Sequence, residues 1–128
     1  MVRFDPVTAP TPLVLLVDDY EDSRFLYVHA LRRSGFHVEE AEDGKEALEK
    51  AIALLPAIVV MDLSLPVMDG WEAIRRLRGD ARTKHIPIVA LTGHSLHAAE
   101  DNPGFDEVLI KPCLPEQLTA RVRVLLAR

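Results

Sequence analysis

The chain has 128 residues, of which 48% are hydrophobic and 27% are charged, and its formal net charge is −5. This length and composition are typical of one globular domain that buries a core without disulfides or a structural metal. The excess of acidic residues, 20 against 15 basic ones, excludes a polycationic surface, so no direct contact with nucleic acid is expected. The longest aliphatic run, Leu13–Val17, is far shorter than the roughly 20 residues that cross a bilayer, so no membrane insertion is expected.

The start of the chain and its cysteine content bear on domain organisation and compartment. Residues 1–12 are expected to form a disordered lead-in, because their prolines oppose a helix and no apolar periodicity accompanies them. We expect one folded domain over residues 13–128. The single cysteine, Cys113, cannot form an internal disulfide and is compatible with a reducing, cytoplasmic location.

Five short apolar runs are candidate strands. Four of them are nearly continuous in apolar character, which predicts burial on both faces, as in a parallel sheet covered by helices on each side. These four runs are residues 13–17, 57–61, 86–91 and 108–110. The fifth run, residues 36–41, alternates between apolar and polar residues and is predicted to be an edge strand.

Amphipathic stretches separate the predicted strands. Asp43 with Glu46, and Asp69 with Glu72, have the spacing of a capping box and predict the starts of two helices. Two further helices are predicted over residues 20–31 and 114–126. This alternation of strands and helices predicts an α/β fold, a doubly wound parallel sheet with right-handed crossovers.

Polar residues follow the four apolar strands at the points where they end. They are Asp18 and Asp19, Asp62, Thr92, and Lys111. The carboxyl ends of strands in an open parallel sheet face one crevice, and that crevice is where such folds bind ligands. We therefore expect these five side chains to converge.

The residue types at these positions suggest a particular chemistry. Three carboxylates in one crevice repel one another unless a cation joins them, and oxygen ligands suit Mg²⁺, so Asp18, Asp19 and Asp62 are a predicted Mg²⁺ site. A cation, a hydroxyl donor and a metal ion together suit the binding of a phosphoryl group. Here Lys111 would supply the cation and Thr92 the hydroxyl. A carboxylate can itself be the phosphoryl acceptor, and Asp62 is the best candidate because it comes from an inner strand.

Each of these residues also has an ordinary structural interpretation. Asp19 could simply cap the first helix. Asp62 and Thr92 could each begin an ordinary turn, and Lys111 could be a solvated lysine. Their occurrence together at successive strand ends favours the functional interpretation.

Five sequence pieces carry a resemblance to a known family. They are LVLLVDD, EEAEDGKEAL, IVVMDLSLPVMDG, IVALTG and VLIKP, in that order along the chain. Over residues 13–128 the chain resembles the receiver domain of two-component response regulators, of the stand-alone, single-domain type. The resemblance implies a flavodoxin-like sheet of five parallel strands in the order 2-1-3-4-5, with helices on both faces.

The resemblance also implies a function and a set of ligands. Asp62 would accept a phosphoryl group from the phosphohistidine of a histidine kinase or a histidine phosphotransfer protein. Asp19, Asp62 and the backbone carbonyl of Ser64 would bind Mg²⁺, and Asp18 would act mainly through water.

Thr92 and Lys111 would bind the phosphoryl oxygens, and the peptide between Lys111 and Pro112 would be cis. Such a protein is a phosphoprotein that catalyses its own phosphorylation and dephosphorylation, not a dedicated enzyme. It would signal by docking a downstream protein partner. The sequence does not identify that partner.

Three residues are expected to modulate the aspartyl phosphate. In the family, the residues two beyond the phosphoacceptor and two beyond the threonine tune hydrolysis, and here these are Ser64 and His94. Gly93, which lies between the threonine and His94, is assigned to the same modulatory group.

The chain departs from the family pattern on the side expected to contact partners. Val108 stands at the switch position, where the family commonly has Tyr or Phe, whose ring rotates inward. Valine has no ring to rotate, so a switch here is expected to rely on movement of the backbone or of a helix. The segment between Thr92 and Lys111 is short, and the helix within it is expected to be brief or irregular. Leu114 stands where a helix cap is expected before Pro115. These departures predict an unconventional output surface.

The sequence is also compatible with other functions. A phosphate-independent interaction module on the same fold, or a receiver excised from a hybrid kinase, are the main alternatives. A phosphohydrolase of the haloacid dehalogenase kind needs a second carboxylate two residues after its nucleophile, where this chain has Ser64. Because the receiver fills most of the chain, output is expected through docking.

Overall fold

The computed structural model of the protein describes residues 11–93 and 102–128. Its strands are β1 (Leu13–Val17), β2 (His37–Ala41), β3 (Ile58–Asp62), β4 (Ile88–Thr92) and β5 (Glu107–Ile110). The helices in the described residues are α2 (Glu21–Arg33), α3 (Gly44–Leu54), α4 (Gly70–Gly79) and α5 (Pro115–Leu126). The five predicted strands and the four helices predicted within the described residues are thus present, with strand boundaries that differ by at most two residues.

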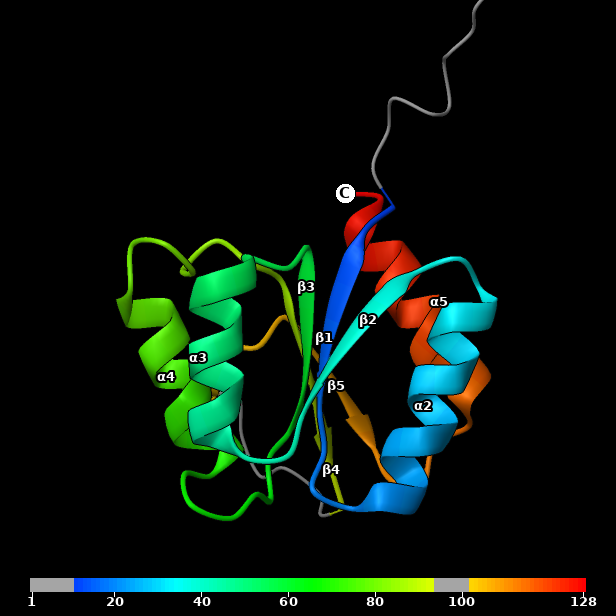
Figure 1. Ribbon diagram of the computed structural model, residues 1–128, viewed down its shortest axis with the longest axis horizontal. Helices are drawn as coiled ribbons and strands as arrows, with labels where there is room; N and C mark the ends of the chain where they lie inside the picture. The colour runs from blue at the N-terminus through cyan, green and yellow to red at the C-terminus, as the bar shows by residue number, and fades with distance from the viewer. Residues whose placement is uncertain (1–10, 94–101) are drawn as a thin grey trace, which may run out of the picture.

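All five strands are parallel, and their order across the sheet is β2-β1-β3-β4-β5. Helices α2 and α5 lie side by side on one face, and α3 and α4 lie side by side on the other (Figure 1). The predicted fold class, a doubly wound, flavodoxin-like α/β sheet, is confirmed.

Two hydrophobic clusters hold the helices to the two faces of the sheet. Because successive strand residues point to opposite faces, β1 contributes Val14 and Leu16 to the cluster under α2 and α5. It contributes Leu15 and Val17 to the cluster under α3 and α4. These four side chains are fully buried, which explains the continuous apolar run in the sequence.

The helix starts confirm one half of each predicted capping box. The Asp43 side chain accepts a hydrogen bond from the Glu46 N–H at 2.7 Å, and Asp69 accepts one from the Glu72 N–H at 2.9 Å. The reciprocal half differs, because the Glu46 carboxylate accepts from the Glu42 N–H and the Glu72 carboxylate pairs with arginines of its own helix. Single-sided capping is therefore enough to begin both helices.

The ends of the first and last helices also follow the sequence. Helix α2 ends at Arg33, and Gly35 beyond it has a φ of +98°, as expected for a helix-terminating glycine. Leu114 provides no side-chain cap for α5. Instead, its backbone N–H donates to the Gln117 side chain at 2.8 Å, which satisfies one group at that helix end.

The expectation that all four apolar strands are buried on both faces is wrong for β5. Its first three residues are half-buried and Ile110 is exposed, because β5 lies at the edge of the sheet beyond β4. β2 lies at the other edge, as its alternating pattern predicts. A short apolar run therefore does not distinguish an inner strand from an edge strand.

The outer edge of β2 carries a specific feature. The His37 N–H and the Ala41 carbonyl face the β1 side, so the carbonyls of Val38 and Glu40 face outward. Arg32 of α2 donates to the Val38 carbonyl at 3.1 Å, and Lys50 of α3 donates to the Glu40 carbonyl. Both outward carbonyls are thus bound by cationic side chains from the flanking helices.

Some expectations fall on parts of the chain outside the described residues. Most of the expected lead-in, residues 1–12, lies there, and the proposed domain division stays a prediction. The helix expected between Thr92 and Lys111 also falls largely on residues 94–101, outside the described part. Among the described residues, no helix is long and apolar enough to cross a membrane.

Candidate functional site

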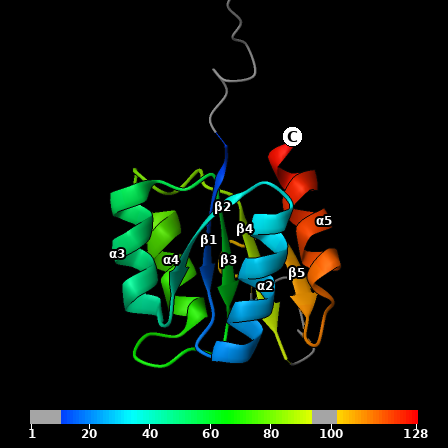
Figure 2. The ribbon, with the colours of Figure 1, turned by 45° about the vertical axis from the view of Figure 1, so that its right-hand side comes forward.

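The polar residues singled out by the sequence lie at one end of the sheet. Asp18 directly follows β1, Asp62 ends β3, Thr92 ends β4 and Lys111 directly follows β5. Since the strands are parallel, these positions share the carboxyl edge of the sheet, which is its lower end in Figures 1 and 2. The topology thus brings together residues that are up to 93 positions apart in the chain.

Lys111 joins two of the carboxylates. Its Nζ donates to Asp18 Oδ2 at 3.2 Å and to Asp62 Oδ2 at 3.1 Å. Burial acts to lower the pKa of Lys111, but the two carboxylates outweigh it and hold the pKa above its ordinary value. The side chain is therefore an ammonium directed into the site. The peptide between Lys111 and Pro112 is cis, as the resemblance implies.

Asp18 is completely buried, and both of its carboxylate oxygens accept hydrogen bonds. Oδ1 accepts from the Tyr20 N–H at 2.9 Å, and Oδ2 accepts from the Ser23 hydroxyl at 3.0 Å as well as from Lys111. Helix α2 begins after Tyr20, and the Tyr20 side chain makes no capping hydrogen bond to the helix. The aspartate that binds the entry to this helix is thus Asp18, and the alternative role of Asp19 as its cap is not observed.

Asp62 is 5% exposed and has both carboxylate oxygens in contact with donors. Oδ1 accepts from the Ser64 N–H at 2.9 Å, and Oδ2 accepts from Lys111. Burial raises the pKa of Asp62 above its usual range, and the bonds from Ser64 and Lys111 offset this rise only in part. Burial therefore disfavours the ionised form of the Asp62 carboxyl, and a cation bound beside it would favour that form.

The carboxylates of Asp18, Asp19 and Asp62 form one cluster. Each offers an oxygen, and these oxygens lie within 4.8 Å of one another. Asp18 and Asp62 are buried, while Asp19 is exposed, so the cluster is open to solvent on the Asp19 side. A set of oxygen donors with one open side fits Mg²⁺, which retains several waters and takes one or two carboxylates.

The remaining predicted residues are distributed around this cluster. Thr92 is 4% exposed and its carbonyl accepts the Lys111 N–H, which ties the end of β4 to the residue after β5. Ser64 and Gly93 are exposed, next to Asp62 and Thr92 respectively. His94 lies outside the described residues. Their modulatory roles stay predictions.

Val108 lies within β5 and is partly buried against the cluster under α3 and α4. Its predicted importance as a switch position also stays a prediction. The structure does explain its burial, because Val108 pairs with Ala90 of the inner strand β4.

Sequence reasoning missed two residues that support the site. Ser23 donates to the Asp18 carboxylate, and Arg24 donates to the Asp18 carbonyl at 2.8 Å. Both lie in the first turn of the helix that follows the acidic pair. A hydroxyl and a basic residue one helical turn beyond a strand-end aspartate were the available signal.

Comparison with known proteins agrees with this geometry. The family described as "Response regulator receiver domain" matches residues 14–123. "Transcriptional regulatory protein PrrA" of Mycobacterium leprae is 38% identical over 121 residues, which cover 92% of this chain and 51% of that protein. The chain thus spans about half the length of the curated relatives it matches.

Two solved structures extend the comparison to three dimensions. A putative response regulator from Chloroflexus aurantiacus has a TM-score of 0.86 and 33% identity, covering 93% of this chain and all of that one. The receiver domain of sensor histidine kinase PA1611 from Pseudomonas aeruginosa, with magnesium coordinated in its active site cleft, has a TM-score of 0.85 and 28% identity. That match covers 93% of this chain and 100% of the other. On its sequence, its fold and its acidic strand-end cluster, this chain belongs to the response regulator receiver domain family.

Proposed function

We propose that the protein is a phosphoacceptor that takes a phosphoryl group onto Asp62 from the phosphohistidine of a histidine kinase or histidine phosphotransfer protein. Receiver domains of response regulators are signalling phosphoacceptors in two-component systems, and they bind Mg²⁺ at an acidic site. The observation that carries the proposal is the position of the Lys111 ammonium, within 3.2 Å of both Asp18 and Asp62.

The transfer follows from the environment of Asp62. One Asp62 oxygen attacks the phosphorus, a P–O bond forms, and the P–N bond to the donor histidine breaks with its electron pair remaining on nitrogen. Lys111 offsets the negative charge on the phosphoryl oxygens, and the Thr92 hydroxyl donates to one of them. The Ser64 N–H holds the carboxylate in place.

Asp19, Asp62 and the Ser64 carbonyl would hold Mg²⁺, and Asp18 would contribute through water. When bound, the ion supplies positive charge that offsets the phosphoryl oxygens and the clustered carboxylates. The chemistry of the donor set supports Mg²⁺ binding here. Among the described residues, the ammonium of Lys111 pairs with two of the three clustered carboxylates, which leaves an excess of negative charge. The phosphorylated domain would then signal by docking a protein partner.

Phosphorylation by acetyl phosphate tests this function. With Mg²⁺ present, the wild-type protein should gain one phosphoryl group that is released by hydroxylamine, as an acyl phosphate is. Asp62→Asn should abolish this gain, because an amide is not a nucleophile for phosphorus. Lys111→Ala should lower the labelling rate at least about tenfold, which corresponds to roughly 1.4 kcal/mol of lost transition-state stabilisation.

Asp22→Asn is the matched control, since Asp22 is an exposed carboxylate at the start of α2, outside the cluster. It should label at the wild-type rate. Undiminished labelling of Asp62→Asn would overturn the assignment of the phosphoacceptor. A wild-type protein that takes no label would favour a phosphate-independent interaction module.

A further inference from the structure

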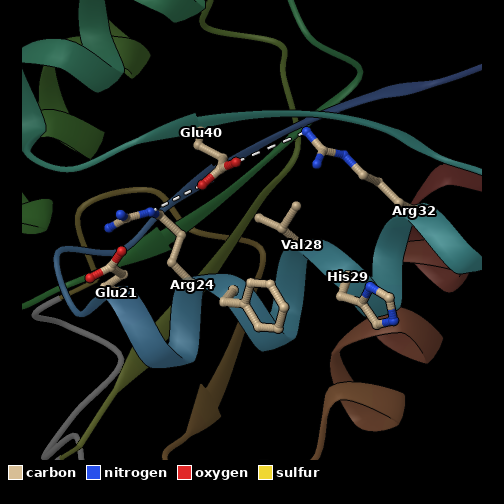
Figure 3. A pocket seen from close by; sticks show the side chains of 7 residues that line it. Glu21, Arg24, Val28, His29, Arg32 and Glu40 are labelled. Carbon is tan, nitrogen blue, oxygen red and sulfur yellow. Dashed lines mark hydrogen bonds and ion pairs between the residues drawn. The ribbon is translucent and has the colours of Figure 1, made fainter.

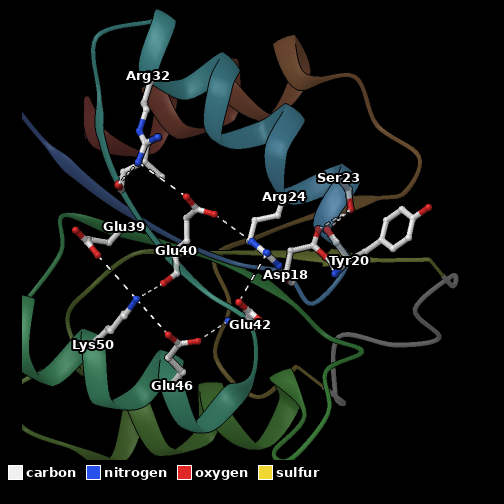
Figure 4. Close-up of polar contacts among 11 residues, drawn as sticks. Asp18, Tyr20, Ser23, Arg24, Arg32, Glu39, Glu40, Glu42, Glu46 and Lys50 are labelled. Carbon is white, nitrogen blue, oxygen red and sulfur yellow. Dashed lines mark hydrogen bonds and ion pairs between the residues drawn. The ribbon is translucent and has the colours of Figure 1, made fainter.

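Arg24 connects the loop that carries the acidic pair to the edge strand β2 (Figure 4). Its Nη1 donates to the Asp18 carbonyl at 2.8 Å, and its Nε donates to Glu40 Oε1 at 3.1 Å. Its Nη2 lies 3.8 Å from Glu42 Oε2. The side chain is only 13% exposed, so a single guanidinium is held among three acceptors from two parts of the chain.

The Asp18 carbonyl is an informative acceptor. It belongs to the peptide group that joins Asp18 to Asp19, and it lies beyond the end of β1 at Val17. The Asp18 N–H is fixed by the Ala41 carbonyl of β2 at 3.1 Å. Arg24 binds the carbonyl of the following peptide group, so the peptide groups before and after Asp18 are each held by one hydrogen bond, and the bond to the Asp18–Asp19 peptide comes from Arg24.

The positive charge of Arg24 is neutralised by carboxylates that lie outside the cluster of Asp18, Asp19 and Asp62. Glu40 and Glu42 both face the guanidinium, and Glu40 also lies 4.0 Å from Arg32, between the two arginines (Figure 3). Arg24 therefore does not serve as the missing counter-charge of the three aspartates. Its effect on them is geometric, through the backbone that carries Asp19.

We propose that Arg24 is a positioning residue of the divalent-ion site. By binding the Asp18 carbonyl, it orients the Asp18–Asp19 peptide so that the exposed Asp19 carboxylate stays beside Asp18 and Asp62. Glu40 holds the guanidinium in the orientation that this requires. The inference rests on the proposed function, because it assigns Arg24 a role in binding the ion that phosphorylation needs.

The test compares Arg24→Lys with Arg32→Lys. Lysine keeps the positive charge but cannot bridge three acceptors as a planar guanidinium does. Arg32 is the matched control, because it lies on the same helix and near the same Glu40 but donates to the Val38 carbonyl, away from the acidic loop. Mg²⁺ binding is measured by amide NMR titration of each intact protein, and phosphorylation by acetyl phosphate is measured across the same Mg²⁺ range.

We expect Arg24→Lys to weaken Mg²⁺ binding about tenfold, the lower end of the range seen when residues that orient metal ligands are changed. The maximal labelling rate at saturating Mg²⁺ should stay at the wild-type level, because Asp62 and Lys111 are untouched. Arg32→Lys should bind Mg²⁺ as the wild type does. A purely structural role for Arg24 would not separate Mg²⁺ affinity from maximal rate.

Wild-type Mg²⁺ affinity in Arg24→Lys would overturn the inference, as would an equal loss in both lysine variants. If Arg24→Lys does not fold, Glu40→Gln provides the second test, since it leaves Arg24 in place but loosens its hold. Glu40→Gln should also weaken Mg²⁺ binding, and unchanged affinity would refute the inference. Failure of the proposed function looks different, because the wild type itself would then bind no Mg²⁺ or take no label on Asp62.

Discussion

Val67, in the loop between β3 and α4, has a backbone conformation that L-amino acids rarely adopt. Its φ is +68°, and the Met68 N–H donates to the Pro66 carbonyl at 2.7 Å across it. A β-branched side chain is poorly tolerated at positive φ because its Cβ crowds the backbone. The residue is 79% exposed, so packing does not compensate for the strain.

Val67→Gly should therefore stabilise the protein. Relief of the left-handed conformation should raise the free energy of unfolding by about 1–2 kcal/mol. The larger conformational entropy of glycine in the unfolded chain should lower it by about 0.5–1 kcal/mol. Urea denaturation should show a net rise of about 0.5–1 kcal/mol in the free energy of unfolding. Val67→Ala retains a Cβ and should gain less, and a glycine variant less stable than the wild type would contradict the account.

At the residue scale, the sequence indicated candidate site residues wherever a polar residue ends or follows an apolar strand. Asp62, Thr92 and Lys111 were singled out this way, and the structure places all three at the carboxyl edge of the sheet. Arg24 was not found, because a basic residue on an amphipathic helix is ordinary in sequence. Only the folded chain brings its guanidinium to the Asp18 carbonyl.

At the scale of elements, the start of α4 is packed directly against the end of β3. A Cβ added at Gly70 would overlap the Asp62 carbonyl oxygen and the Leu63 Cα. The Gly70 N–H donates to the Leu63 carbonyl at 3.1 Å, which fixes this close approach. Glycine at this position thus lets a helix start lie against the backbone of the proposed phosphoacceptor.

Gly70→Ala should lower the free energy of unfolding by about 1–3 kcal/mol, the usual cost of overpacking, because the atoms that the new Cβ would meet belong to the backbone and cannot rotate away. It should also slow labelling by displacing Asp62. Gly79→Ala is the matched control at the other end of α4, where an added Cβ meets nothing within 4 Å. Chemical denaturation should show no loss for Gly79→Ala, and equal stability of the two variants would contradict the packing argument.

The elements themselves were largely predictable, and the exception has a physical cause. Two capping aspartates marked helix starts because their side chains bind local N–H groups, a short-range interaction that the sequence encodes directly. The burial of β5 was not predictable from its apolar run. It depends on which strand lies beside it, and β5 has only β4 as a neighbour in the sheet.

At the scale of the whole molecule, the net charge of −5 matters less than its local distribution. Among the described residues, Asp18, Asp19 and Asp62 form one acidic cluster, and the ammonium of Lys111 pairs with two of them, Asp18 and Asp62. An ion that binds this cluster in the folded state, and not in the unfolded chain, must stabilise the fold.

Mg²⁺ at about 100 times its dissociation constant should raise the free energy of unfolding by about 2.7 kcal/mol. Asp62→Asn should lose most of this gain, which urea denaturation with Mg²⁺ or with EDTA can measure. An equal gain in the variant would show that Mg²⁺ binds elsewhere.

The stabilisation by Mg²⁺ should also depend on pH. Burial raises the pKa of Asp62 above the 3.8 of an ordinary aspartate, so folding favours its protonated form. Without the ion, this contribution to stability is complete below pH 3.8 and is lost as the pH rises through the raised pKa. The ion requires the ionised carboxylate, so its stabilising effect should increase over the same rise in pH.

The cationic side chains along β2 affect how copies of this chain meet. An edge strand is a template onto which another strand can add, and aggregation often begins there. A strand approaching β2 would find the carbonyls of Val38 and Glu40 already bound by Arg32 and Lys50. Arg32 and Lys50 therefore compete with an incoming strand for the two outward carbonyls, and their positive charges oppose the addition of a second strand along this edge.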